Sequence, residues 1–251
     1  MTVRTPASRI RGAVVPLALC AGLTAGLTAC AADPDEGTNG VGRLAAPDIE
    51  RKARTVADGA KAVRLAGTLV SRGGTFKLNM RLKRDGASGS VTTRNGTFEL
   101  TRVGDTLYLK ADAGFWSHGK GDDKPTETDV EAAEKLDGKY VKVPQDDPSY
   151  KQLRGFTDMK PLLDGLIGLH GEKVKGDRTR VGGVRTIKVK GGAGGEGGVL
   201  DVSLDGSPYP VQFARGGGGG VVTLSDWNKD FPLAAPTKDE TVDYGKQLPR
   251  T

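Results

Sequence analysis

Alternation of hydrophobic and polar residues dominates the middle of the chain and predicts β-strands. In the clearest run, 76–83, every second side chain is hydrophobic, which is typical of a strand with one buried face. Turn signals separate the runs, and Asn95-Gly96 is the dipeptide most typical of a tight hairpin. The predicted strands of this part are 63–69, 76–83, 90–94, 97–103 and 106–111. They form a predicted antiparallel meander.

The remaining patterns predict a few helices, followed by a second group of strands. Hydrophobic residues spaced three and four apart predict a helix at 48–58, with Asp48 as its N-terminal cap. The further predicted helices begin at the capping boxes Thr128-x-x-Glu131 and Ser149-x-x-Gln152 and at Asp158, the last leading into the apolar segment Met159–Leu169. The further predicted strands are 139–143, 178–181, 184–190, 199–204, 209–214 and 221–225. Because no β-α-β alternation occurs, about ten short strands indicate an α+β protein with an antiparallel sheet.

The N-terminal thirty residues are typical of a secretory signal peptide. Three arginines and no acidic residue precede an uncharged stretch, 12–29. The stretch ends in Leu27, Thr28 and Ala29, directly before Cys30, which resembles a bacterial lipobox. Cys20 follows the bulky Leu19, so Cys30 is the expected site of diacylglycerol attachment. A retained transmembrane helix is the alternative, because 18 uncharged residues are close to the minimum for spanning a bilayer.

Three regions follow from this interpretation. Residues 1–29 are the expected signal peptide, 30–46 the lipidated cysteine with a flexible tether, and 47–251 the folded domain. Cleavage removes three positive charges, so the net charge falls from +6 for the full chain to +3 for the mature protein. The mature protein is therefore expected on the extracytoplasmic face of the cell membrane, held by its lipid anchor.

The composition offers little for catalysis or for nucleic-acid binding. The chain contains two histidines and two cysteines, and its glycine runs match no phosphate-binding motif. Aromatic residues make up 5% of the chain, and they do not alternate with basic clusters. We therefore expect no enzyme activity, no metal, no cofactor beyond the covalent diacylglycerol, and no nucleic-acid partner. The alternative to a protein without enzyme activity is a hydrolase of the cell envelope, which would need a polar cleft with a catalytic base.

Several segments together resemble the LppX/LprG-type lipoproteins of actinobacteria. The resemblance covers about residues 45–243 and rests on the lipobox at Cys30 and on the order of its motifs. These motifs are Asp48–Val70, GSVTTRNGTFELTRVGDTLYLKADAGFW (89–116), LDGKYVKVP (136–144) and TLSDWNKDFPLAAPTKDE (223–240). The resemblance implies a LolA-like half-barrel, in which a curved sheet carries helices and a hydrophobic cavity on its concave side. It also implies a lipid or glycolipid ligand.

Hydrophobic side chains of the clearest strands and of the apolar helix are the candidates for lining such a cavity, and equally for an ordinary core. They are Phe76, Leu78, Met80, Phe98, Leu100, Leu162, Leu163, Leu166 and Ile167. The leading hypothesis is non-covalent binding of a lipid or another hydrophobic molecule. The alternative is an interaction module without a cavity, binding a protein or a cell-wall polymer through Lys77, Arg81 and Lys83. The sequence identifies no protein partner.

Overall fold

A computed structural model describes residues 33–71, 74–117 and 126–243 of the chain. The chain divides into two units, Met1–Pro34 and Asp35–Thr251, and the fold below is that of the second unit. The expected signal peptide and the lipobox residues Leu27, Thr28, Ala29 and Cys30 lie outside the described residues. No helix in the described ranges is long and apolar enough to span a bilayer.

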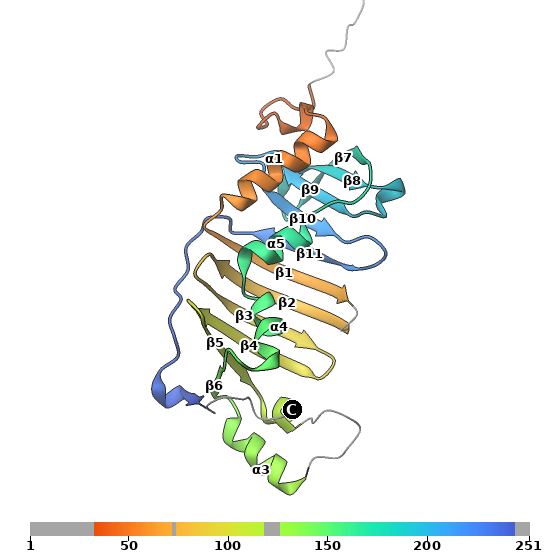
Figure 1. Ribbon diagram of the computed structural model, residues 1–251. Coiled ribbons are helices and arrows are strands. Elements are labelled where there is room, and N and C mark those ends of the chain that lie inside the picture. The colour runs from red at the N-terminus through yellow and green to blue at the C-terminus, as the bar shows by residue number, and fades with distance from the viewer. Residues whose placement is uncertain (1–32, 72–73, 118–125, 244–251) are drawn as a thin grey trace, which may run out of the picture. The chain divides into compact units, whose positions relative to one another are not determined.

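Twelve strands of the described chain form one antiparallel sheet that is curved but not closed (Figure 1). Its spatial order is β12-β6-β5-β4-β3-β2-β1-β11-β10-β9-β8-β7, and only β12 and β6 pair in parallel. The strands are β1 (Ala62–Ser71), β2 (Gly74–Lys83), β3 (Gly86–Thr93), β4 (Gly96–Val103), β5 (Thr106–Ala111), β6 (Tyr140–Val143), β7 (Lys173–Val181), β8 (Val184–Gly191), β9 (Val199–Ser203), β10 (Pro210–Ala214), β11 (Gly220–Ser225) and β12 (Thr241–Asp243).

Five α-helices and three short 3-10 helices complete the described fold. The α-helices are α1 (Ala46–Asp58), α2 (Ala113–Ser117), α3 (Glu127–Leu136), α4 (Pro148–Gly155) and α5 (Met159–Leu166). The 3-10 helices are η1 (Val41–Arg43), η2 (Ala193–Gly195) and η3 (Lys238–Glu240). Helices α1, α4 and α5 lie against one side of the sheet, which we call the inner face (Figure 1). The α+β fold with helices on a curved sheet, expected from the sequence, is confirmed.

Two glycines in the middle of strands let neighbouring strands approach closely on this inner face. Gly89 of β3 lies opposite Met80 of β2, and a Cβ atom on Gly89 would collide with the carbonyl oxygen of Asn79 and lie 2.7 Å from the Met80 Cα. Gly67 of β1 lies opposite Leu78, and a Cβ there would lie 2.7 Å from the Cα of Val222. Glycine inside a strand is typical of such close backbone approach. These positions favour a bent sheet over a flat one.

Several local boundaries differ from the sequence prediction. The hairpin between β3 and β4 turns at Arg94-Asn95, since Thr93 pairs with Gly96, so the turn expected at Asn95-Gly96 is shifted by one residue. Helix α4 is capped by Asp147, whose side chain accepts a hydrogen bond from the Ser149 amide at 2.8 Å. The cap therefore lies two residues nearer the N-terminus than the predicted cap, Ser149. The reason is Pro148, whose fixed φ suits the first helical position.

The predicted tether also needs correction at its C-terminal end. Residues 35–45 belong to the folded unit, and Val41 is 1% exposed. The Asn39 side chain donates to the carbonyl oxygens of Ser203 at 2.9 Å and Gly206 at 3.0 Å, in the connection between β9 and β10. Low hydrophobic periodicity suggested a linker, but long-range polar contacts hold this segment in place. Such contacts leave no periodic signal in the sequence.

Candidate hydrophobic ligand site

The inner face of the central strands is a continuous hydrophobic floor. Each residue of the following series pairs with the next one on the neighbouring strand, from β1 to β5: Leu65, Met80, Gly89, Leu100 and Leu109. Since directly opposed residues share a face, these positions form a row across β1 to β5. The leucines and the methionine of the row are at most 2% exposed. The floor therefore consists of the side chains that period-two alternation placed on one face.

Helices α4 and α5 cover this floor with hydrophobic side chains. Met159, Leu163 and Leu166 of α5 are buried, and Ile167, which follows the helix, is 1% exposed. The spacing of three and four residues places them on one side of the helix, as an amphipathic helix on a sheet requires. Pro161 lies in the first turn, where the missing amide proton costs no intrahelical hydrogen bond. We call α4, α5 and their connection at 156–158 the cover.

Polar contacts fix one end of the cover to the turn between β4 and β5. The Arg102 guanidinium, on a side chain that is nearly buried, donates to Thr157 Oγ1 at 3.2 Å, the Thr157 carbonyl at 2.9 Å and the Gly104 carbonyl at 2.7 Å. Tyr150 of α4 donates its hydroxyl proton to the Asp105 carbonyl at 2.7 Å. Arg154 lies 3.3 Å from the Asp105 carboxylate and donates to the Tyr150 hydroxyl, which raises the pKa of Arg154.

The hydrophobic assembly has an apolar, partly exposed edge where β2 and β4 begin. Phe76 at the start of β2 contacts Phe156 with ring centroids 5.5 Å apart, and Phe98 at the start of β4 contacts Phe115 at 5.3 Å. Partly buried hydrophobic residues at this edge, which we call the rim, are Leu69, Phe76, Phe115, Leu153, Phe156 and Leu162. Phe98 and Arg102 lie near opposite ends of β4, so the contact of Phe98 with Phe115 and the hydrogen bonds of Arg102 are separated along this strand.

A buried polar atom next to the rim has no hydrogen-bond partner among the described residues. Trp116 is 5% exposed, and no acceptor in the described ranges lies within hydrogen-bond distance of its Nε1. Its ring contacts Phe115 edge-on, at 5.3 Å between centroids. A buried donor without a partner costs about 1–3 kcal/mol, so such groups are uncommon in folded proteins. An acceptor on a ligand would remove this cost.

All nine candidate residues from the sequence belong to this one hydrophobic assembly. Most of them are buried, whereas Phe76 and Leu162 are partly buried. Side chains as enclosed as Leu78 and Met80 contact no water-sized space, so a ligand reaches them only if the cover moves. The sequence prediction did not include the rim residues Leu69, Phe115, Leu153 and Phe156, nor Arg102. The strand pattern did contain a signal for Arg102, because it shares a face with Phe98 and Leu100.

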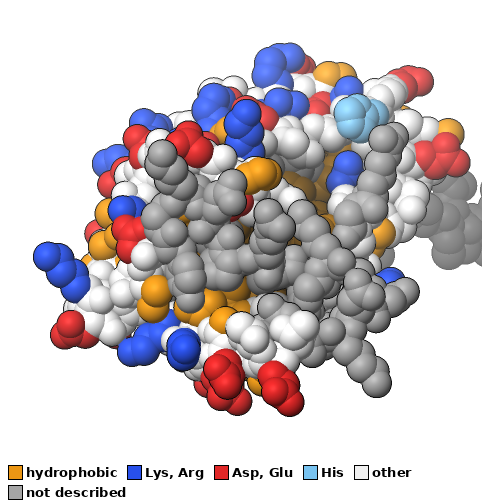
Figure 2. Space-filling view, turned by 60° about the horizontal axis from the view of Figure 1, so that its bottom comes forward, with side chains coloured by type: hydrophobic (Ala, Val, Ile, Leu, Met, Phe, Trp, Pro, Cys, Tyr) orange, Lys and Arg blue, Asp and Glu red, His pale blue; other side chains and the backbone are white. Residues whose placement is uncertain are grey.

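One of the three basic residues predicted for an interaction surface is engaged by neighbouring side chains. Lys83 lies 2.5 Å from the Asp230 carboxylate and 4.6 Å from the centre of the Phe231 ring. Lys77 and Arg81 are exposed. Viewed from the end of the sheet that carries β6 and α3, basic and acidic side chains are interspersed around the described surface, with hydrophobic side chains between them (Figure 2).

A curved open sheet with helices on its inner face defines a half-barrel, the class of fold that the LppX/LprG-type resemblance implies. No family model matches the sequence, and no curated protein matches it significantly. Among solved structures, LprF from Mycobacterium bovis matches with a TM-score of 0.52 and 16% identity, over 76% of this chain and 96% of LprF. The lipoprotein LppX from Mycobacterium tuberculosis matches with a TM-score of 0.46 and 16% identity, over 75% of this chain and 99% of LppX. The match to LprF confirms the resemblance at the level of the fold.

Proposed function

We propose that the chain is a lipid-anchored lipoprotein on the extracytoplasmic face of the cell membrane that binds a lipid or another hydrophobic molecule non-covalently. The ligand lies between the inner face of the sheet and the cover. The observation that carries the proposal is the rim, where partly buried hydrophobic side chains continue into a fully buried hydrophobic floor. Concave, mostly apolar sites with few polar groups are typical of small-molecule binding.

The contacts of the cover suggest how a ligand enters. Arg102, Tyr150 and Arg154 hold the cover at the β4–β5 turn, whereas the rim end is held by contacts among hydrophobic side chains. Non-directional contacts exchange readily for contacts with an acyl chain, but directional hydrogen bonds do not. Entry at the rim with a pivot at the polar end therefore requires the least loss of interactions.

Trp116 indicates the polar part of the ligand. Its Nε1–H lies in an apolar environment beside Phe115 and lacks an acceptor within the described residues. A carbonyl or carboxylate oxygen accepts such a hydrogen bond, and a pure hydrocarbon does not. The ligand class that satisfies both features is an acyl chain carrying an ester or a carboxyl group.

Native mass spectrometry of protein purified from its own membrane tests the proposal, together with titration of a fluorescent fatty acid. Phe76→Glu places a charge at the rim and should abolish both the co-purified mass and the titration signal. Val70→Glu is the matched control, because Val70 belongs to the same hairpin but is 40% exposed. It should leave binding unchanged. The proposal fails if wild-type protein carries no lipid and takes up no fatty acid, or if both variants bind normally.

A comparison of palmitic acid with hexadecane tests the role of Trp116. Trp116→Phe keeps an aromatic ring and removes the N–H group. It should weaken binding of palmitic acid by about tenfold, as expected for a buried hydrogen bond, and leave binding of hexadecane within about twofold. Equal effects on the two ligands would assign Trp116 a packing role alone.

A further inference from the structure

A cavity lies at the other end of β1 from the rim. The rim includes Leu69, near the end of β1, whereas this cavity borders Ser225, which pairs with Arg64 near the start of β1. Its volume is about 450 Å³, and it is lined by the turn between β7 and β8, the connection between β9 and β10, and the end of β11. The size is in the range of small-molecule pockets, about 300–1,000 Å³. Nothing in the proposed lipid site uses these residues.

One wall of the cavity is a pair of stacked aromatic rings. Tyr209 and Trp227 lie almost parallel, 10° apart, with centroids separated by 4.7 Å, and both side chains are partly exposed. Trp227 Nε1 donates to the Pro210 carbonyl at 2.9 Å, and the Tyr209 hydroxyl accepts from the Asn228 amide at 2.6 Å. Their polar atoms are therefore engaged with the protein. The edges of the rings and the faces turned away from the stack remain for a ligand.

The backbone on both sides of Trp227 is strained. Asp226 and Asn228 have φ values of 52° and 60°, and they are the two non-glycine residues with positive φ among those described. Such residues persist where the surrounding structure enforces them, often at binding sites. Here the strain accompanies the placement of the Trp227 ring on Tyr209.

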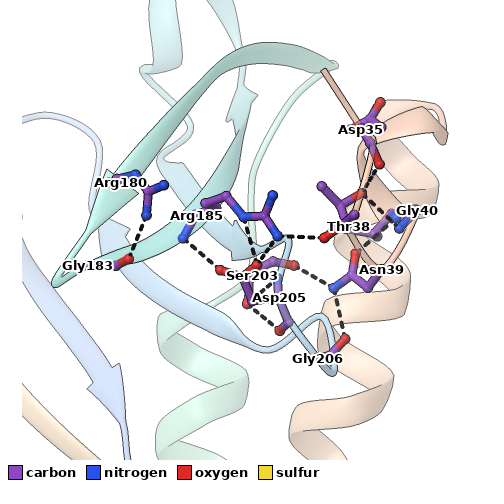
Figure 3. A network of polar contacts seen from close by, with 12 residues as sticks. Asp35, Thr38, Asn39, Gly40, Arg180, Gly183, Arg185, Ser203, Asp205 and Gly206 are labelled. Atoms are coloured by element: carbon purple, nitrogen blue, oxygen red, sulfur yellow. Dashed lines mark hydrogen bonds and ion pairs between the residues drawn. The ribbon is translucent and has the colours of Figure 1, made fainter. Parts of the chain in front are cut away.

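A polar part of the cavity lining, at Ser203 and Asp205, is held by a hydrogen-bond network (Figure 3). Arg185 donates to the Asp205 carboxylate from Nε at 2.8 Å and from Nη2 at 2.6 Å, and the Ser203 hydroxyl donates to the Asp205 carbonyl at 2.8 Å. Asn39, from the segment before α1, donates to the carbonyls of Ser203 and Gly206. Since the network fixes Asp205 before any ligand arrives, little conformational entropy is lost on binding.

The charges of the cavity balance each other. Both of its carboxylates are paired with cations, Asp205 with Arg185 at 2.6 Å and Asp226 with Lys229 at 3.2 Å. A cationic ligand would have to compete with these pairs. A neutral ligand with many hydroxyl groups would not, because a paired carboxylate keeps lone pairs that accept further hydrogen bonds.

We propose that this cavity binds a neutral saccharide unit. The C–H groups of a pyranose carry partial positive charge and pack on the electron-rich face of an aromatic ring. Its hydroxyl groups donate to the fixed carboxylate oxygens of Asp205. Because its lining combines this aromatic pair with the polar side chains of Ser203 and Asp205, the cavity matches the amphipathic character of a sugar ring. The ligand is a monosaccharide or disaccharide unit of a glycan, and it is distinct from the hydrophobic ligand of the inner face.

Saturation-transfer NMR and isothermal titration with maltose, cellobiose and chitobiose test this site in the full folded domain, with choline chloride as the cationic probe. We expect at least one disaccharide to bind with a millimolar dissociation constant. Trp227→Ala and Tyr209→Ala should each weaken that binding by about tenfold or more, and Trp227→Phe by less. Tyr140→Ala, an aromatic loss on β6 outside the cavity, should leave it unchanged.

Other outcomes overturn the proposal. Absence of binding by all three disaccharides up to about 50 mM would do so, as would sugar binding that survives both alanine variants. Saturable choline binding without sugar binding would assign the cavity to a cation instead. Circular dichroism and thermal unfolding of each variant establish that it is folded. The Phe76→Glu variant, which removes the proposed lipid binding, should retain sugar binding, so the two proposals fail independently.

Discussion

The Arg102 guanidinium on β4 donates hydrogen bonds to both the side-chain hydroxyl and the main-chain carbonyl of Thr157, 55 residues further along the chain. Both residues are buried, Arg102 at 3% exposure and Thr157 at 0%. The three oxygens that accept from Arg102 belong to neutral groups, so the charge is compensated by dipoles. Because Thr157 connects α4 to α5, this contact joins the cover to the sheet.

Replacing Arg102 should therefore destabilise the fold. Arg102→Ala leaves the Thr157 and Gly104 carbonyls without their donor and creates a cavity, at a cost of about 2–4 kcal/mol in the free energy of unfolding. Urea denaturation measures this change. Arg81→Ala, an exposed arginine on the outer face, should change the same quantity by less than about 0.5 kcal/mol. Equal, small effects for both variants would contradict a role for Arg102 in holding the cover.

Gly89 offers a test of the sheet geometry. Gly89→Ala places a methyl group against the Asn79 carbonyl and 2.7 Å from the Met80 Cα, so the strands must separate locally. We expect a loss of about 2–3 kcal/mol in the free energy of unfolding. Gly165→Ala is the control, since no atom lies within 4 Å of a Cβ at this helical position. It should stabilise the protein by about 0.5–1 kcal/mol, because alanine favours a helix over glycine. Thermal and urea unfolding distinguish the two directions.

The sequence predicts well where local pattern and local structure agree. Alternation over 76–83 is sufficient for β2, because a half-buried strand requires a period of two and little else. Strand β12 was not predicted, since Thr241–Asp243 is too short to show a period. Its parallel pairing with β6 depends on residues about 100 positions away. The burial of a charged residue such as Arg102 has the same origin, because its acceptors belong to a distant part of the sequence.

The candidate site shows the same division. The hydrophobic floor follows from patterns within single strands, and the structure brings these residues together with Leu163 and Leu166 of α5. The rim could not be predicted, because it depends on which hydrophobic residues the cover leaves exposed. Phe156 illustrates this, since its contact with Phe76 spans 80 positions and lies just outside α4. Tertiary packing decides how deeply a side chain is buried, whereas the periodicity of the sequence shows only on which face of its strand or helix the side chain lies.

The pair formed by Arg185 and Asp205 predicts a pH dependence. Hydrogen bonds from Arg185 lower the pKa of the Asp205 carboxyl group below the ordinary value of an aspartate. Since the folded-state pKa is the lower one, the pair contributes stability above the unfolded-state pKa, near pH 4, and loses it as the pH falls through the folded-state pKa. Carbon-detected NMR titration should show this directly. Arg185→Gln should raise the pKa of Asp205, and Arg180→Gln, whose effect is only coulombic, should raise it less. An unchanged pKa in Arg185→Gln would contradict the assignment.

The two cysteines provide a matched pair for testing the anchor. Cys30 follows Leu27, Thr28 and Ala29, whereas Cys20 follows the bulky Leu19, so only Cys30 is expected to carry a diacylglycerol. Cys30→Ala should release the protein from the detergent phase into the aqueous phase, because stable membrane attachment requires the acyl chains. Cys20→Ala should leave both partitioning and the mass of the mature N-terminus unchanged, since residue 20 belongs to the expected signal peptide. If Cys30→Ala instead remained bound to membranes at its full uncleaved mass, the uncharged stretch 12–29 would be a retained transmembrane helix, and the lipoprotein interpretation would be wrong.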